Sequence, residues 1–481
     1  MLVLACGCKA DYHDAYIYFE LPEKPVTVDP QTASSESELL VVRNTFEGLL
    51  RKNESGAIIC GAAASYNVDG LNYTFKLREN AVWSNGTPVT ANDFVFALRR
   101  AVEPATASPF VSSLFSISGA EGVYSGKLPS EQLGVTAVDD YTLNISLCRE
   151  DPDFENTLTT SAAMPCNEEF FNKSVGKYGL DVENTISNGS YVLKKWNKED
   201  FGIRLYRNEE YNGTSKALNG AVFLSCNEEE TPMELLSKNS VDMAFISSAE
   251  EANAKEMGLT TKAFENTCWF LTFSADVPQN VRLAFEKLVG AEVYGKSLKN
   301  GYRAADSIFP SAFAQKGTAP AGGIVQYDLE GGKSLFSNAL NKMPDKKFPS
   351  DIKLYYYDDG NVKSVVTDIV GHWQNNLGAY VNIESVSSPD LLISQLTEQT
   401  YSMAFFPVTS KNGALEEYLK NFGIQYNGET MEDIQQRVLK GNNMTPVIFS
   451  NTTLAYSNAL NSVYIFSENG YIDFAYIIKH D

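Results

Sequence analysis

The stretch spanning residues 352–408 constrains the fold most, because the patterns of strands and helices alternate along it. Three segments, "IKLYYYDD", "YVNIESV" and "SMAFFPV", have the character of strands. Between the first two, apolar residues at helical spacing occupy residues 362–377 and end at Gly378, a residue type that often closes a helix. A shorter helix is expected over residues 389–396. This β-α-β-α-β order predicts a parallel sheet covered by helices, which binds ligands at the carboxyl ends of its strands.

Composition sets the broad class of protein. With 481 residues, of which 43% are hydrophobic and 12% aromatic, the chain can bury the cores of two or three domains. It has 39 Lys and Arg against 60 Asp and Glu, and the net charge of −21 opposes binding to nucleic acids and to anionic lipid head groups. Seven cysteines without a CxxC pair and only three histidines offer few ligands for a metal. We therefore expect no nucleic-acid partner and no metal site.

A second organised stretch, residues 73–104, reads as scaffold. Its first part, "YTFKLRENAV", alternates apolar and polar residues as a strand with one wet face does. Asn85-Gly86 then predicts a turn, and Thr90 with Asp93 three residues later predicts a capping box at a helix start. The apolar residues that follow share one helical face, two arginines suit the helix end, and Pro104 stops it. Nothing in the stretch is an obvious nucleophile or base.

Signals of an enzyme are weak throughout the chain. The sequence has no G-x-S-x-G elbow and no HExxH motif. "LEGGKSLF" ends like a phosphate-binding loop, but Tyr327 stands where its leading glycine is required, so a solvated helix is the better interpretation. Paired acids such as Asp139-Asp140 and Asp358-Asp359 lie in polar, turn-like settings. We expect a protein that is not an enzyme and needs no cofactor; a hydrolase stays open only through residues far apart in the sequence.

The N-terminal segment "MLVLACGCKAD" looks like the tail of a bacterial lipoprotein signal peptide. In such peptides a cysteine after a short apolar run is lipidated and becomes the mature N-terminus. Cys6 fits this position best, and Cys8 is the alternative. Residues 1–8 would then be a signal remnant, and the protein would be anchored by lipid to the outer face of the membrane. An ordinary apolar terminus is the competing interpretation.

A family resemblance adds to these patterns. The run "YTFKLRENAVWSNGTPVTANDFVFALRRAVEPATASPF" closely resembles the signature region of the oligopeptide-type solute-binding proteins of bacterial ABC importers, the extracellular solute-binding family 5. The resemblance continues in "VDPQTASSESELLVVRNTFEGLL", "SNGSYVLKKW" and "LLSKNSVDMAFI", and again from Thr445 to His480. It implies an extracytoplasmic, monomeric binding protein that delivers an oligopeptide or a peptide-like solute to the permease and ATPase subunits of an importer.

The resemblance also implies an α/β fold of the periplasmic-binding-protein type, with two lobes and an inserted small domain of mixed α+β structure. Such lobes close on a ligand by hinge motion. The hinge would lie at two crossings between the lobes, near Asn266 and Pro446. The expected parts are a discontinuous lobe I (residues 9–52, 166–265 and 448–481), the small domain (53–165) and lobe II (266–447).

Five positions are predicted to line the ligand site. The resemblance places Ser34, after "VDPQTA", in lobe I, and it places Phe110, at the end of "TASPF", on an aromatic wall from the small domain. Trp269, in "TCWFLTF", is near the crossing into lobe II. For the two aromatic residues, a place in the hydrophobic core is an equally good interpretation.

The remaining two positions, Phe405 and Lys411, depart from the family. Members that hold the free amino group of a peptide carry an aspartate in a pattern like "A-R-A-G-W-x-A-D-Y". In "AFFPVTSKN", Phe405 replaces the arginine and Lys411 falls at the aspartate. Because a cation cannot pair with an ammonium group, the usual amino-terminal anchor is missing. Lys411 could accept a carboxylate, or it could be a solvated loop residue. The alternative function is therefore a binding or sensing protein for a non-peptide or carboxylate-bearing ligand.

Overall fold

The computed structural model describes most of the chain, and statements of structure below concern these residues alone. They are 16–53, 55–196, 202–213, 215, 218–225, 230–275, 277–316, 326–349, 352–386, 392, 403–410, 415–424, 429–441, 444–461, 463, 465–466 and 471–480. Both cysteines of the predicted lipidation site and Lys411 lie outside them. In the part described, no helix has the length and apolar character needed to cross a membrane.

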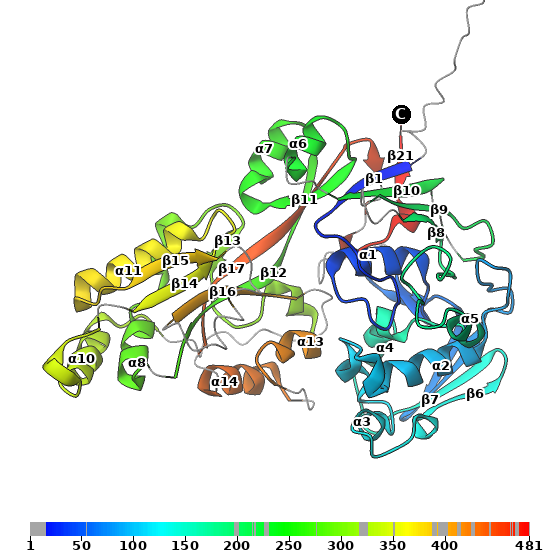
Figure 1. Cartoon of the computed structure of the whole chain (residues 1–481), viewed down its shortest axis with the longest axis horizontal. Coiled ribbons are helices and arrows are strands. Elements are labelled where there is room, and N and C mark those ends of the chain that lie inside the picture. Colours follow the sequence, from blue (N-terminus) through cyan, green and yellow to red (C-terminus); the bar gives the residue numbers. More distant parts are fainter. Residues whose placement is uncertain are drawn as a thin grey trace, which may run out of the picture.

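One mixed sheet extends through both halves of the molecule (Figure 1). Along it the strand order is β15-β14-β16-β12-β17-β11-β1-β10-β9-β8, and β13 pairs with β17 beside this path. The strands are β1 (Tyr16–Leu21), β8 (Tyr191–Trp196), β9 (Ile203–Arg207), β10 (Gly220–Ser225), β11 (Met243–Ser247), β12 (Thr260–Phe273), β13 (Tyr302–Ala304), β14 (Lys353–Tyr357), β15 (Asn382–Val386), β16 (Met403–Thr409) and β17 (Met444–Tyr456).

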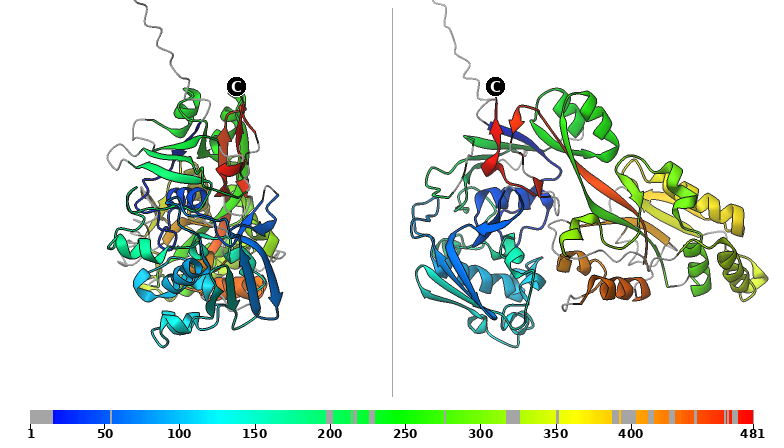
Figure 2. Two further views of the ribbon diagram at one scale, coloured as in Figure 1. Left: turned by 90° about the vertical axis from the view of Figure 1, so that its right-hand side faces the viewer. Right: turned by 180° about the vertical axis from the view of Figure 1, so that it is seen from behind.

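Two long antiparallel strands join the halves of this sheet. They are β12 and β17, which pair with each other; β17 also pairs with β11 of lobe I, and β12 also pairs with β16 of lobe II. Both strands run between the halves in Figure 1 and in the right-hand view of Figure 2. Their pairing shifts between Glu265 and Thr267 and again between Trp269 and Phe270. Asn266 lies in the first shift, and Pro446 pairs with Phe270 at the second. The predicted crossings therefore fall where the ladder is irregular; the domain boundaries themselves stay a prediction.

The three strands and the first helix predicted for residues 352–408 are confirmed in lobe II. β14 pairs in parallel with both β15 and β16, and α11 (Lys363–Leu377) connects β14 to β15. The helix ends at Gly378 in the left-handed conformation, with φ of 65°. Its apolar stripe is buried against the sheet together with α8 (Gln279–Lys287) and α10 (Leu329–Leu340). The helix expected over 389–396 lies outside the described residues apart from Leu392.

The predicted small domain contains the scaffold stretch. Its antiparallel sheet has the order β4-β5-β7-β6, and the apolar residues of β5 that alternate in the sequence are buried. α2 (Ala91–Val102) packs on this sheet, and its capping box is present: the Thr90 backbone N–H donates to Asp93 Oδ2 at 2.7 Å. Burial raises the pKa of Asp93, although hydrogen bonds from Thr90, Trp83 and Asn167 oppose that shift. The strands are β4 (Ala63–Asp69), β5 (Asn72–Leu77), β6 (Val135–Asp139) and β7 (Thr142–Ser146).

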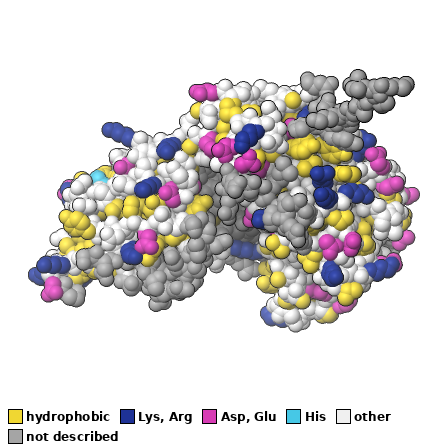
Figure 3. All heavy atoms as spheres, turned by 45° about the horizontal axis from the view of Figure 1, so that its top comes forward, with side chains coloured by type: hydrophobic (Ala, Val, Ile, Leu, Met, Phe, Trp, Pro, Cys, Tyr) yellow, Lys and Arg dark blue, Asp and Glu magenta, His cyan; other side chains and the backbone are white. Residues whose placement is uncertain are grey.

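The remaining elements are short. In lobe I and the small domain they are α1 (Glu36–Thr45), α3 (Ala120–Tyr124), α4 (Phe154–Thr157), α5 (Glu168–Lys173), α6 (Pro232–Ser237) and α7 (Glu251–Glu256), with strands β2 (Leu50–Lys52), β3 (Ile58–Cys60), β18 (Leu460–Asn461), β19 (Ile465–Phe466), β20 (Tyr471–Ile472) and β21 (Ile478–Lys479). In lobe II they are α9 (Ala291–Tyr294), α13 (Leu415–Lys420) and α14 (Met431–Gly441). The surface is hollowed between the two halves of the molecule (Figure 3).

Candidate ligand-binding site

Ser34 lies in the connection between β1 and α1. This connection runs on the side of lobe I that faces lobe II (Figure 1). Ser34 is exposed, whereas Glu38, in the first turn of α1, is only 5% exposed. Glu38 Oε1 accepts the backbone N–H groups of Val26 and Thr27 at 2.9 and 3.1 Å. Its Oε2 accepts those of Ser34 and Ser35 at 2.9 and 3.1 Å. One carboxylate thus holds both ends of residues 26–35, which we call the 26–35 loop.

The middle of the 26–35 loop is tied to α2 of the small domain. Arg100 Nη1 donates to Asp29 Oδ1 at 2.9 Å and to Gln31 Oε1 at 2.8 Å, and Nη2 donates to Asp29 Oδ2. Burial acts to lower the pKa of Arg100, but the hydrogen bonds and charge of Asp29 outweigh it and raise the pKa. Gln31 Nε2 donates onward to the carbonyl of Met164 at 2.9 Å. The sequence pattern predicts only that Arg100 lies near the end of a helix. In the fold its buried charge joins lobe I to the small domain.

Phe110 lies where the small domain meets lobe II. Its side chain is 3% exposed and packs in the core shared by lobe I and the small domain. The preceding carbonyl, that of Pro109, accepts a hydrogen bond from Lys420 Nζ at the end of α13. The segment that Phe110 begins therefore contacts lobe II, while the ring itself is part of a core.

Trp269 and Phe405 are brought together inside lobe II. Their rings stack with centroids 5.6 Å apart, and Tyr357 also stacks on Trp269, with centroids 6.1 Å apart. Trp269 Nε1 donates to Ser450 Oγ at 2.8 Å. Trp269 and Phe405 are 2% and 1% exposed, so in this conformation the core interpretation accounts for both rings. We call Tyr357, Trp269 and Phe405 the aromatic stack.

The carboxyl end of β16 reaches the crossing between the lobes. Thr409, its last residue, lies opposite Thr267, and their hydroxyl oxygens are 2.9 Å apart. The next residue, Ser410, is buried and its backbone N–H donates to the carbonyl of Asn266 at 2.9 Å. Lys411 is the next residue in the sequence, so it directly follows a residue whose backbone is held beside the crossing. The carboxyl ends of parallel strands are where such sheets are expected to bind ligands, so the end of β16 stays a candidate surface for the ligand.

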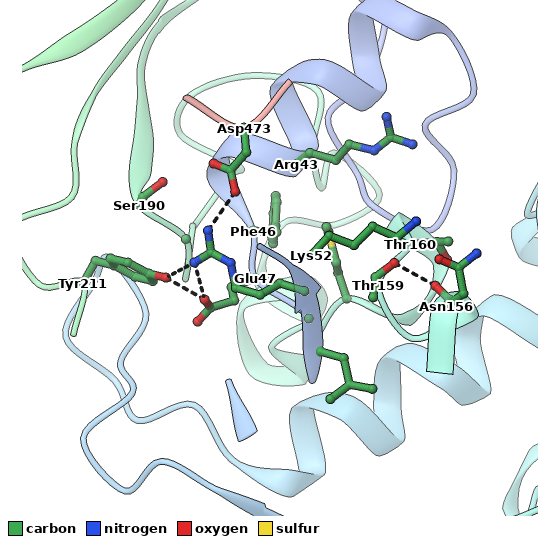
Figure 4. Close-up of a pocket in the computed structure, with 15 residues that line it drawn as sticks. Arg43, Phe46, Glu47, Lys52, Asn156, Thr159, Thr160, Ser190, Tyr211 and Asp473 are labelled. Carbon is green, nitrogen blue, oxygen red and sulfur yellow. Dashed lines mark hydrogen bonds and ion pairs between the residues drawn. The ribbon is translucent and has the colours of Figure 1, made fainter. Parts of the chain in front are cut away.

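A separate hollow of about 660 Å³, counting the space open to solvent, lies between α1, β2 and α4 (Figure 4). Arg51 lines one side of this hollow, and its guanidinium donates hydrogen bonds to Glu47, Tyr211 and Asp473. Burial acts against the charge of Arg51, but Asp473, Tyr211 and Glu47 raise its pKa well above the ordinary value. Because these groups form hydrogen bonds with one another, the cluster has the character of a structural tie between β2 and the C-terminal segment, two parts of the predicted lobe I.

The comparison with known families decides the class of this protein. The profile described as bacterial extracellular solute-binding proteins, family 5 (middle region), matches residues 57–430. The chain belongs to this family. The resemblance found in the sequence is confirmed, and the family is one of extracellular solute-binding proteins.

Characterised relatives of this family 5 protein carry peptide-binding names. The periplasmic murein peptide-binding protein MppA of Escherichia coli is 29% identical over 378 residues, which cover 76% of this chain and 70% of MppA. The oligopeptide-binding protein OppA of Bacillus subtilis is 27% identical over 397 residues, covering 79% of this chain and 72% of that protein. OppA of Salmonella typhimurium is 35% identical over a shorter stretch of 223 residues, 41% of its own length.

Solved structures confirm the two-lobed fold class of this family 5 protein. The pheromone receptor PrgZ superimposes with a TM-score of 0.79 at 20% identity, covering 97% of this chain and all of that one. OppA of Listeria monocytogenes bound to peptide superimposes with a TM-score of 0.75 at 20% identity, covering 97% and 99% of the two chains.

Sequence reasoning missed three residues that hold the 26–35 loop. Glu38 carried a local signal, because Ser35 and Glu38 have the spacing of a capping box, and both halves of that box are present. Arg100 and Asp29 carried none, since 71 residues separate them and only the fold brings them together.

Proposed function

We propose that this protein is the extracytoplasmic binding component of an ABC importer and captures an oligopeptide or a peptide-like solute between lobe I and lobe II. Membership of family 5 over residues 57–430 carries this proposal, because the relatives found in that family are named for binding peptides. The exposed Ser34 on its fixed loop and the end of β16 before Lys411 are the surfaces that the ligand would meet. An extended peptide would bind mainly through its backbone, leaving its side chains in roomy pockets.

Identification of the bound ligand tests the proposal. The full chain, purified without added ligand, is analysed by native mass spectrometry before and after mild denaturation. Co-purified short peptides of mixed sequence are expected. A single non-peptide mass would contradict peptide capture and would support the alternative function, a binding or sensing protein for another solute.

The Lys411 substitution motivates that alternative. At the position of the family's acid, a lysine favours a ligand that presents a carboxylate and disfavours a free ammonium group. If Lys411 anchors a carboxylate, Lys411→Ala should weaken binding of the co-purified ligand at least tenfold, about 1.4 kcal/mol. Unchanged affinity, measured by isothermal titration calorimetry, would remove Lys411 from the site.

The proposed partners follow from the importer role. The closed protein would dock on the permease, which works with the ATPase subunits, and it would act as a lipid-anchored monomer held through Cys6, or through Cys8. Membrane retention of Cys6→Ala and Cys8→Ala variants in cell fractions tests the anchor. Retention of the double variant would contradict it.

A further inference from the structure

We propose that the 26–35 loop is a preorganised ligand-contacting element, and that Glu38 and Arg100 are positioning residues for it. Neither side chain needs to touch the ligand. The inference rests on the proposed function, because it takes Ser34 as a residue that meets the ligand. It deepens that function by naming what holds the lobe I side of the site in shape.

Glu38 holds the 26–35 loop at both ends because each of its two carboxylate oxygens accepts hydrogen bonds from a different end. Oε1 accepts N–H groups from Val26 and Thr27 at the start of the 26–35 loop, and Oε2 accepts them from Ser34 and Ser35 at its end. A carboxylate buried to this extent is stable only when such hydrogen bonds replace water. Its place in the first turn of α1 adds the favourable field of the helix dipole.

Arg100 fixes the same loop from the other side. It holds Asp29 with two nitrogens and Gln31 with one, while the Val28 backbone N–H donates to the carbonyl of Gly179 at 2.8 Å. Gly179 has φ of 73°, and a Cβ there would come within 2.4 Å of the Asp29 backbone nitrogen. The middle of the loop therefore follows the position of α2, and the small domain shares control of the lobe I surface that carries Ser34.

Holding the 26–35 loop in one shape should raise the affinity for the ligand, in addition to any effect on the stability of the fold. A ligand recognised through its backbone needs donors and acceptors already in place, because ordering a loop on binding subtracts from the affinity. Residues 26–35 expose Ser34 while most of the loop's backbone is bonded inward, so its shape is set before any ligand arrives. Releasing either end should lower affinity without removing a ligand contact.

The test uses Glu38→Gln, which keeps the size of the side chain. A glutamine has one acceptor oxygen and one donor nitrogen, so whichever way the amide turns, one end of the 26–35 loop loses both of its bonds. Glu47→Gln is the matched control. Glu47 is also a buried carboxylate of lobe I, but the bonds to its oxygens come from the side chains of Arg51, Arg78 and Tyr211.

Two measurements are made on the full ligand-free chain and both variants. Hydrogen exchange followed by mass spectrometry should show at least tenfold faster exchange in segments containing residues 26–27 or 34–35 for Glu38→Gln alone. Affinity is measured by calorimetry for a set of tri- to nonapeptides that includes RPPGFSPFR, the peptide in a structure of Haemophilus influenzae OppA. Affinity should fall at least tenfold for Glu38→Gln and less than threefold for Glu47→Gln.

Equal losses of affinity in the two variants would overturn the inference, because general destabilisation would then explain both. Faster exchange with unchanged affinity would also overturn it, since the ligand would not use the loop. If the wild-type chain binds no peptide of the set, the proposed function fails and the ligand-positioning role fails with it; the exchange pattern still shows whether Glu38 pins the loop. Should Glu38→Gln not fold, Ser35→Ala removes only the hydroxyl that accepts from the Glu38 backbone N–H, and a threefold loss of affinity is expected.

Discussion

The two sides of the candidate site are held in shape by opposite means. On the lobe I side, the 26–35 loop is fixed by the charges of Glu38, Asp29 and Arg100, each bonded to several partners. On the lobe II side, the rings of the aromatic stack pack together on the sheet beside the crossing, and Trp269 donates a hydrogen bond to Ser450. Hydrogen bonds between charged groups place a backbone accurately, but the arrangement fails when any one partner is removed. Stacked rings tolerate small changes of side chain as long as the replacement fills the same volume of the core.

Arg100→Met should have the largest effect. The substitution leaves Asp29 buried without its cation, and breaking a buried ion pair in this way costs about 3–5 kcal/mol of unfolding free energy. Urea denaturation at pH 7 measures it. The control is Arg149→Met, because Arg149 pairs with Glu121 on the surface at 3.7 Å, where a loss below about 1 kcal/mol is expected. Equal losses would mean that the buried pair is no stronger a tie than the exposed one.

Trp269→Phe should have a smaller effect. A phenylalanine can still stack on Tyr357 and on Phe405, but it is smaller and leaves Ser450 Oγ without its donor, so a loss of about 1–3 kcal/mol is expected. Combining it with Ser450→Ala in a double-mutant cycle isolates the hydrogen bond, which should contribute about 1 kcal/mol. A loss as large as that of Arg100→Met would contradict the tolerance ascribed to the stack.

The smallest effect concerns pH. Burial, with a further contribution from the charge of Lys333, lowers the pKa of His372 on α11 below 6.5, and Tyr327 Oη lies 3.1 Å from its Nε2. The folded state therefore prefers the neutral ring. Its stabilising effect is complete above the ordinary histidine pKa and is lost as pH falls through the lowered value.

His372→Gln should accordingly flatten the decline in unfolding free energy below pH 6.5. The exposed His480 supplies the control, and His480→Gln should leave the decline as it is in the wild type. A decline of the same slope in His372→Gln and the wild type would show that His372 does not contribute to the acid sensitivity of lobe II.

Sequence reasoning succeeded where the signal is local. The strand and helix order of lobe II follows from the spacing of apolar residues, and the capping box of Thr90 and Asp93 follows from two residues three apart. The pairing of Arg100 with Asp29 could not be predicted, because it depends on how the small domain docks on lobe I. Trp269 and Phe405 show a further limit: an aromatic residue near a ligand site and one in a core have the same appearance in a sequence.

The paired strands β12 and β17 have a mechanical consequence. They are hydrogen-bonded on both sides of Asn266, with Glu265 opposite Asn451 and Thr267 opposite Ser450. The lobes are thus connected by one hydrogen-bonded two-stranded ribbon rather than by two separate segments. Rotation of one lobe relative to the other must twist this ribbon where its ladder of hydrogen bonds is interrupted. We expect the ladder to resist this twisting elastically, so that the ribbon favours one relative orientation of the lobes and returns them towards it after a displacement.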